Sequence, residues 1–231
     1  MEYYMIHCCN SRMWYVTKFL VPSMIQQGIP RDHIFIYQDK NNIGNLRAFV
    51  DSSNRLVSVC YKKGISGVWH LQDDVVLSKK FCETTNKYPA GIVCGFTCNY
   101  NENPKPGAFK LSETELWFSF PCIRIPTYIL SRFARWANES LWQSKYFREW
   151  VMRNKGDDLI FQEWLYDQKD LADFTHVNLN PNVVDHIDTL IGGTVVNGQR
   201  DADFDTHSIF WNEQDVIEDL KIKLEEYKKI T

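Results

Sequence analysis

The sequence predicts an α/β domain with a mainly parallel central sheet and helices on both faces of that sheet. Short apolar runs typical of buried strands alternate with helical stretches through roughly the first hundred residues, an order typical of parallel strands joined by helices. Several of these runs end abruptly in polar or acidic residues, at the edge where open α/β sheets bind their ligands. A length of 231 residues suits one large domain of this kind.

The elements of the first half follow from the apolar runs and from the residues that interrupt them. Each predicted strand is a short apolar run bounded by polar residues, and each predicted helix carries apolar residues at helical spacing. Pro22 predicts a kink inside the first helix, and Gly28 predicts its end. The expected strands are 3–9, 33–37, 57–61, 67–71 and 90–97, and the expected helices are 13–27 and 45–52.

The second half is predicted to be richer in helices. The last of them carries Ile217, Leu220, Leu224 and Tyr227 at three- and four-residue spacing. That stripe predicts packing against the domain itself, with the seam of a dimer as the alternative. The aromatic run 117–126 predicts core, or the wall of a ligand site. The expected helices are 128–136, 140–152, 159–167 and 213–230, whereas 99–107 is expected to be a loop and 174–194 irregular.

The composition is that of a folded protein and narrows the function classes. Hydrophobic residues make up 44% and charged residues 24% of the chain, which excludes a disordered protein. A net charge of −3 argues against nucleic-acid phosphates as the main partner. Seven irregularly spaced cysteines without a CxxC pair indicate free thiols in a reducing compartment. With neither a signal peptide nor a long apolar span, we expect a cytoplasmic protein without a membrane partner.

An acid pair, Asp73 and Asp74, follows the predicted strand 67–71. Adjacent carboxylates at the end of a buried strand are costly unless a cation or solvent compensates them. Oxygen ligands suit Mg²⁺ or Mn²⁺, which also bind substrate phosphates. Arg12 and Asp39 follow two other predicted strands, so these polar groups should converge on one edge of the sheet. The alternative for the pair is an exposed turn with two solvated aspartates.

The segment Leu71–Val75 resembles the DxD motif of GT-A glycosyltransferases, in the variant with two adjacent acids. The opening Ile6–Arg12 is similar to that of the inverting N-acetylglucosaminyltransferases of this fold, which begin with a strand, a short polar turn with an Arg, and a helix. Their second strand ends in a Gln-Asp pair, here Gln38 and Asp39. The resemblance covers roughly the first hundred residues, and the rest in patches.

This resemblance implies a single GT-A domain over residues 1–231. It divides into a nucleotide-sugar-binding half, 1–100, an acceptor-binding half, 101–212, and a C-terminal helix, 213–231. The implied donor is a nucleotide-diphosphate sugar, a UDP-sugar first, and the implied cofactor is Mn²⁺ or Mg²⁺.

The resemblance also implies roles for the residues near the acid pair. Asp74 would hold the metal, Arg12 would face the nucleotide or diphosphate, and Asp39 would contact the base. Asp73 and Gln72 would bind hydroxyl groups of the ribose or sugar. Gln72 stands where the family more often has an acid, which implies modest metal affinity.

A second acidic cluster, Asp157 and Asp158, precedes the predicted helix 159–167. Taken alone, acids at this position are ordinary helix capping, and we expect the helix dipole to lower the pKa of Asp158. The cluster also looks like the acidic element of inverting GT-A enzymes, whose second acid deprotonates the acceptor hydroxyl. The resemblance therefore implies Asp158 as the catalytic base, with Asp157, Trp117 and Arg124 at the acceptor.

A late histidine is the remaining candidate ligand. His186, between Asp185 and Ile187, fits the context in which GT-A enzymes supply a histidine to the metal or diphosphate. Neutral imidazole is a competent Mn²⁺ ligand. His176 is the alternative ligand, and a purely structural role is the alternative for both residues.

Together these features imply a metal-dependent, inverting glycosyltransferase that uses a hydroxyl acceptor. Residues 120–124 and 184–187 also look like small phage-encoded members, which implies the host cytoplasm as location and a hydroxylated nucleobase in DNA as acceptor. The enzyme alternative is a nucleotidyltransferase, although Asn10–Arg12 lacks the glycines of its usual loop. The other alternative is a non-catalytic sugar-binding module. The sequence does not decide between a monomer and a dimer through the last helix.

Overall fold

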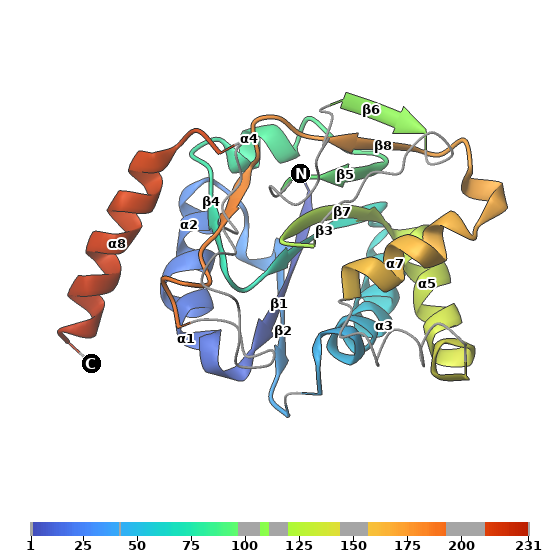
Figure 1. The fold of residues 1–231 in the computed structure, drawn as a ribbon, viewed down its shortest axis with the longest axis horizontal. Coiled ribbons are helices and arrows are strands. Elements are labelled where there is room, and N and C mark those ends of the chain that lie inside the picture. Colours follow the sequence, from blue (N-terminus) through green and yellow to red (C-terminus); the bar gives the residue numbers. More distant parts are fainter. Residues whose placement is uncertain are drawn as a thin grey trace.

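The computed structural model of the chain describes residues 2–41, 43–96, 107–110, 120–143, 157–192 and 211–230. A seven-stranded sheet with the order β2-β1-β3-β7-β5-β8-β6 forms its centre (Figure 1). Five of the strands, β1, β2, β3, β5 and β8, run in one direction, and β6 and β7 run against them. The predicted mainly parallel sheet is therefore confirmed. The strands are β1 (Tyr3–Cys9), β2 (Ile34–Asp39), β3 (Gly67–Gln72), β5 (Ile92–Cys94), β6 (Gly107–Lys110), β7 (Cys122–Pro126) and β8 (Thr175–Asn178).

Helices cover both faces of this sheet (Figure 1). Side chains alternate across β1, so that Tyr4 and Ile6 join the core on one face and Met5 joins the core on the other. The first core includes α1, α2 and α8, and the second includes α3, α5 and α7. The α-helices are α1 (Met13–Tyr15), α2 (Val21–Gln26), α3 (Asn45–Lys63), α4 (Phe81–Thr85), α5 (Thr127–Glu139), α7 (Asp157–Tyr166) and α8 (Gln214–Lys228). Short 3-10 turns cover Asn10–Arg12, Arg31–His33, Leu141–Gln143 and Lys169–Leu171.

A small second sheet stands beside the central one. It pairs β4 (Val75–Leu77) with β9 (Val184–His186) in antiparallel register, with Val75 opposite His186. The backbone N–H of Ile187 also donates to the carbonyl of Asp74 at 2.8 Å. This pairing carries a late segment of the chain to the end of β3. The expectation that 174–194 is irregular was wrong, because β8 and β9 both lie within it and form through partners distant in sequence.

The helix α3 corrects another prediction. We expected a short helix over 45–52 and a strand over 57–61, a segment that contains Val57 and Val59. The structure has one continuous helix, Asn45–Lys63, that ends where Gly64 adopts a left-handed φ of 68°. Phe49, Leu56 and Cys60 fall on one helical face and are buried against the sheet. Burial of that face outweighs the weak β preference of the Val residues.

The predicted helix 13–27 is divided into shorter pieces, and the last helix is formed as expected. A π-helical segment, Val16–Leu20, separates α1 from α2, and Pro22 lies in the first turn of α2. The kink expected at Pro22 stays a prediction. On α8, Ile217, Leu220 and Leu224 are buried in the first core, and the ring of Tyr227 stacks on Trp14 with centroids 5.4 Å apart. The stripe of α8 therefore packs against its own domain. Within the described ranges, no helix has the length and apolar character needed to cross a membrane. Of the expected helix 140–152, residues 144–152 lie outside the described residues.

Candidate functional site

The polar groups expected at the sheet edge gather where β1, β2 and β3 end. Arg12 lies in the 3-10 turn after β1, Asp39 is the last residue of β2, and Asp73 and Asp74 form the turn between β3 and β4. The register places Cys9 of β1 opposite Asp39, so the ends of the two strands are level. All four side chains are buried, with residue exposures between 4% and 7%. The alternative of a solvated acid pair is thus wrong.

Arg12 bridges the two aspartates. Its Nη1 donates to Asp73 Oδ1 at 3.0 Å and to Asp74 Oδ2 at 2.5 Å. The other oxygen of Asp73, Oδ2, accepts the backbone N–H of Cys9 at 2.7 Å. The sequence indicated each of these residues but not that they form one buried ion cluster. Such a cluster tolerates burial only while its charges are paired.

His186 completes the cluster from β9. Its Nε2 lies 3.1 Å from Asp74 Oδ2, and its Nδ1 lies 3.6 Å from Asp188 Oδ1. Burial alone would raise the pKa of Asp74, but His186 and Arg12 outweigh it and hold that pKa well below its ordinary value. Asp74 is therefore ionised at neutral pH. Asp188, 1% exposed, is a residue that sequence reasoning missed. Its signal was the spacing of two residues from His186, which suits a group that orients the ring.

His176, the alternative to His186, lies elsewhere. It is in β8, paired in register with Ile92 of β5 and Phe109 of β6. Two strands, β7 and β5, separate β8 from β3 and its acid pair. The histidine that reaches the acid pair is thus His186.

The residues fit a divalent cation that takes few ligands from protein. Asp74 Oδ1 is buried and has no hydrogen-bond partner among the described residues, which leaves a carboxylate oxygen available beside the imidazole of His186. No set of three or more His, Cys, Asp or Glu side chains gathers as a metal site in the described part of the chain. Mg²⁺ commonly binds through one or two carboxylates and completes its shell with water and substrate phosphates. Asp74 and His186 suit that kind of site.

The neighbouring candidate residues at this edge, Asp39 and Gln72, lie beside segments that hydrogen bonds hold in place. Asp39 Oδ1 accepts the backbone N–H of Ile43 at 3.1 Å, which orders the chain after β2. Gln38 Nε2 donates to Asn10 Oδ1 at 2.7 Å and ties the ends of β2 and β1 together. Gln72 is half-buried beside the acid pair and closes β3. These residues form the rim next to the ion cluster.

Asp158 lies in the first turn of α7, and its Oδ1 accepts the N–H of Leu159 at 2.9 Å. Helix α7 leads through a short turn into β8, which is parallel to β5 and thus to β1. It therefore begins toward the carboxyl ends of the strands, as Figure 1 shows. Burial raises the pKa of Asp158 to about 6, despite the backbone hydrogen bonds that lower it. The expected lowered pKa was wrong, since burial exceeds the effect of the helix N-terminus.

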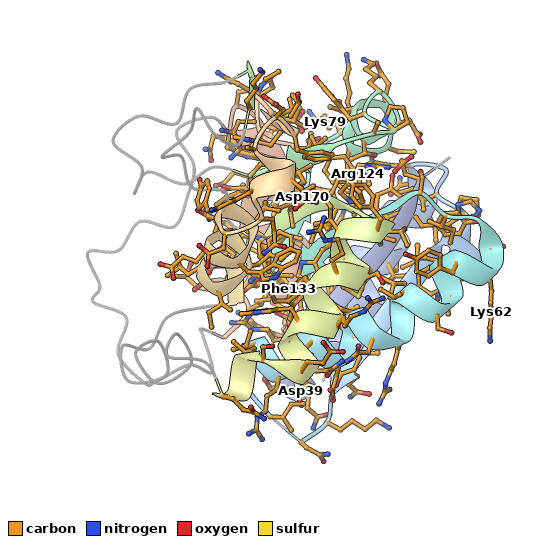
Figure 2. The ribbon with its side chains drawn as sticks, turned by 90° about the vertical axis from the view of Figure 1, so that its right-hand side faces the viewer. Asp39, Lys62, Lys79, Arg124, Phe133 and Asp170 are labelled. Carbon is orange, nitrogen blue, oxygen red and sulfur yellow. The ribbon has the colours of Figure 1, made fainter. Side chains whose placement is uncertain are left out.

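Arg124 corrects the expectation of an acceptor contact. Its Nε donates to Glu2 Oε2 at 2.9 Å, and its two Nη atoms donate to the carbonyls of Gly91 and Pro89 at 2.9 and 2.5 Å. The guanidinium lies over Gly67, the first residue of β3, so that a Cβ there would meet it at 2.6 Å. Figure 2 shows Arg124 toward the opposite end of the molecule from Asp39. Its role there is structural. Trp117 and the side chain of Asp157 lie outside the described residues.

Comparison with known proteins identifies the fold. No protein-family model matches the chain, and no curated protein sequence matches it significantly. The structure of residues 1–349 of TarS from S. aureus aligns with a TM-score of 0.50 at 11% identity, over 83% of this chain and 62% of that chain. The structure of a glycosyltransferase involved in the glycosylation of the major capsid of PBCV-1 aligns with a TM-score of 0.44 at 9% identity, over 78% of this chain and 83% of that chain.

The TarS alignment supports a statement about architecture. The mostly parallel seven-stranded sheet between helices matches a GT-A-like fold, which confirms the expected fold class. An identity of 11% conveys the fold alone. The activity must therefore be argued from the residues of the site.

Proposed function

We propose that the chain is a metal-dependent, inverting glycosyltransferase that moves a sugar from a nucleotide-diphosphate donor to a hydroxyl acceptor. One observation carries the proposal: the buried cluster of Arg12, Asp73, Asp74 and His186 at the carboxyl edge of a GT-A-like sheet. Burying two carboxylates without a functional need is costly. Ligand sites of open α/β sheets lie at this edge.

The donor would lie across the ends of β1, β2 and β3. Asp39 suits the N–H groups of a base such as uracil, and Asp73 and Gln72 suit hydroxyl groups of the ribose or sugar. Asp74 and His186 would hold Mn²⁺ or Mg²⁺, which neutralises charge on the departing diphosphate when bound. Arg12 adds a permanent positive charge whose planar fork matches phosphate oxygens.

Asp158 supplies the base in this proposal. A carboxyl group with a pKa of about 6 is mostly ionised at pH 7, yet more basic than an ordinary aspartate. It would take the proton of the acceptor hydroxyl while the acceptor oxygen bonds to the anomeric carbon. The bond from that carbon to the diphosphate breaks, and its electron pair leaves with the diphosphate. Attack from the face opposite the leaving group inverts the configuration.

The acceptor is proposed as a class. A hydroxyl group is required by the chemistry, and the specific candidate is a hydroxylated nucleobase in DNA. The net charge of −3 gives no general attraction for DNA. A DNA acceptor would therefore be bound through local contacts, and its binding should weaken little with salt compared with a basic DNA-binding protein.

A thermal-shift panel of nucleotide sugars, each with and without Mn²⁺, tests the proposal. One nucleotide sugar should stabilise the protein in Mn²⁺, by about 2.7 kcal/mol at one hundred times its dissociation constant. Product analysis then separates the alternatives. Release of a nucleoside diphosphate supports glycosyl transfer, whereas release of pyrophosphate would identify a nucleotidyltransferase. Sugar binding without any turnover would leave a binding module.

A further inference from the structure

The guanidinium of Arg12 lies against the two carboxylates beside which a metal cation is proposed to bind. It lies 2.5 Å from Asp74 Oδ2 and 3.0 Å from Asp73 Oδ1. The side chains of Arg12, Asp73 and Asp74 are 7%, 8% and 6% exposed. Little water can therefore screen their charges, and Arg12 is a close positive charge for both carboxylates.

This arrangement conflicts with simple metal binding to the empty protein. A divalent cation on Asp74 would share that carboxylate with the guanidinium, and like charges this close repel strongly where water is excluded. Asp73 is also occupied, since its two oxygens accept from Arg12 and from the backbone of Cys9. Arg12 would have to leave Asp74 before a cation could be held tightly there.

A diphosphate offers Arg12 a new partner. Arg12 follows directly after β1 in a 3-10 turn at the carboxyl edge, where the donor is proposed to lie. Arginine binds phosphate and carboxylate through the same planar fork. Exchange of an aspartate for a phosphate therefore keeps the guanidinium paired and leaves Asp74 Oδ2 in contact with His186 but no longer with Arg12.

We propose that Arg12 is a resident counter-ion of the Asp73–Asp74 pair, which excludes divalent cations from the empty protein and passes to the donor diphosphate when donor and cation bind. This inference rests on the proposed function for the identity of the diphosphate. It makes the binding of cation and diphosphate mutually dependent, and such coupling is reciprocal.

The decisive measurement is Mn²⁺ affinity without any nucleotide, read from the loss of the electron paramagnetic resonance signal of free Mn²⁺. Arg12→Met removes the charge and keeps a long side chain. It should bind Mn²⁺ at least about tenfold more tightly than the wild type, the factor that corresponds to a modest difference of charge interaction. The matched control is Arg132→Met. Arg132 also donates to a carboxylate, that of Asp170, although through both of its Nη atoms, and it lies on α5 outside the cluster.

Each outcome of the Mn²⁺ titrations either supports the proposal or overturns it. Tighter Mn²⁺ binding in Arg12→Met, with Arg132→Met like the wild type, supports the proposal. Equal affinity in all three proteins overturns it, and so does an equal gain in both variants, which would reflect net charge alone. Should Arg12→Met fail to fold, Arg12→Gln decides. Glutamine also removes the charge but keeps a side chain that can donate a hydrogen bond to a carboxylate, so a Mn²⁺ affinity above that of the wild type supports the proposal and an unchanged one overturns it.

A second titration, with UDP present, separates this inference from the proposed function. UDP should raise the Mn²⁺ affinity of the wild type by a larger factor than that of Arg12→Met, because only the wild type must first move Arg12. Failure of every nucleotide to bind would remove the glycosyltransferase proposal while leaving the nucleotide-free comparison valid. Donor binding and turnover with an unchanged Mn²⁺ affinity in both Arg12 variants would overturn the inference about Arg12 and leave the glycosyltransferase proposal standing.

Discussion

Asp74 is the residue on which the acid cluster depends most. One of its oxygens meets Arg12 and His186, and the other is buried without a hydrogen-bond partner among the described residues. An oxygen in that state is costly unless a ligand uses it. A cation bound by this oxygen, as proposed, would remove that cost.

Asp74→Asn keeps the shape of the residue and removes its charge. We expect Mn²⁺-dependent hydrolysis of the donor to be lost. The free energy of unfolding should fall by about 1.5–3 kcal/mol, the scale of a hydrogen bond to a charged group, and chemical denaturation would measure it. Arg12 keeps Asp73 as a partner, so the variant should remain folded. Undiminished Mn²⁺-dependent activity would remove the metal role of Asp74.

Asp158 allows a prediction with two readouts. Asp158→Asn should lower transfer by about 10²–10⁴-fold, the usual range for a general base, while donor affinity stays unchanged. In the wild type, kcat/KM should rise with pH through about 6 as Asp158 becomes ionised. In the variant, kcat/KM should not show this rise. If the variant kept the rise near pH 6, the rise would belong to the ionisation of another group.

The same pKa gives Asp158 an effect on stability. Its folded pKa is raised above the unfolded value, so its contribution is fully present below about pH 4 and is lost as the pH rises through 6. Asp158→Asn should therefore match the wild type at low pH and exceed it at pH 7 to 8, by at most about 3 kcal/mol. Urea denaturation at several pH values would show this divergence. A variant less stable than the wild type at pH 8 would contradict it.

Prediction from sequence succeeded for individual residues and failed for their partners. Strand ends and residue chemistry were enough to place Arg12, Asp39, Asp73 and Asp74 on one edge. The bridge from Arg12 spans 61 and 62 positions to its two aspartates, and nothing local in the sequence encodes such a contact. The raised pKa of Asp158 likewise depends on what surrounds the carboxyl group in the folded chain.

At the scale of elements, structure that depends on local sequence was predicted, and structure that depends on distant partners was not. The strand 3–9 was predicted with its bounds because a continuous apolar run suffices to identify it. The strands β8 and β9 are short and polar in part, and they exist because β5, β6 and β4 pair with them. In α3, the segment 57–61 was expected to be a strand, and only burial on the sheet decides for a helix. Contacts distant in sequence are thus where single-sequence reasoning failed.

Helix α8 offers a matched pair of substitutions. Leu220 is 6% exposed in the first core, and Ile222 on the same helix is 61% exposed. Leu220→Ala should cost about 2–4 kcal/mol of unfolding free energy, as buried large-to-small changes do. Ile222→Ala should change it by no more than about 0.5 kcal/mol. Thermal or urea unfolding would measure both, and equal losses would show that α8 does not pack in solution as it does here.

At the scale of the whole molecule, the carboxyl end of the central sheet and the opposite end differ in the charged groups they hold. The carboxyl ends of the central strands carry the buried ion cluster, whose charges suit a ligand. The opposite end is closed by Arg124, which joins Glu2 before β1 to the chain at Pro89 and Gly91 before β5. The first end is where the substrate is proposed to bind, and the second holds together segments that are distant in sequence.

Arg124→Met tests this separation of duties. The variant leaves Glu2 without its cationic partner and two carbonyls without their donors. Breaking a buried pair in this way costs about 3–5 kcal/mol, less here because Glu2 is 12% exposed. We therefore expect a clear loss of unfolding free energy, measured by urea denaturation. Donor affinity and the KM for the acceptor should stay within about twofold of the wild type, because no atom of Arg124 is expected to reach either substrate. A large rise in acceptor KM with unchanged stability would instead return Arg124 to the acceptor site and make the structural role given to it here wrong.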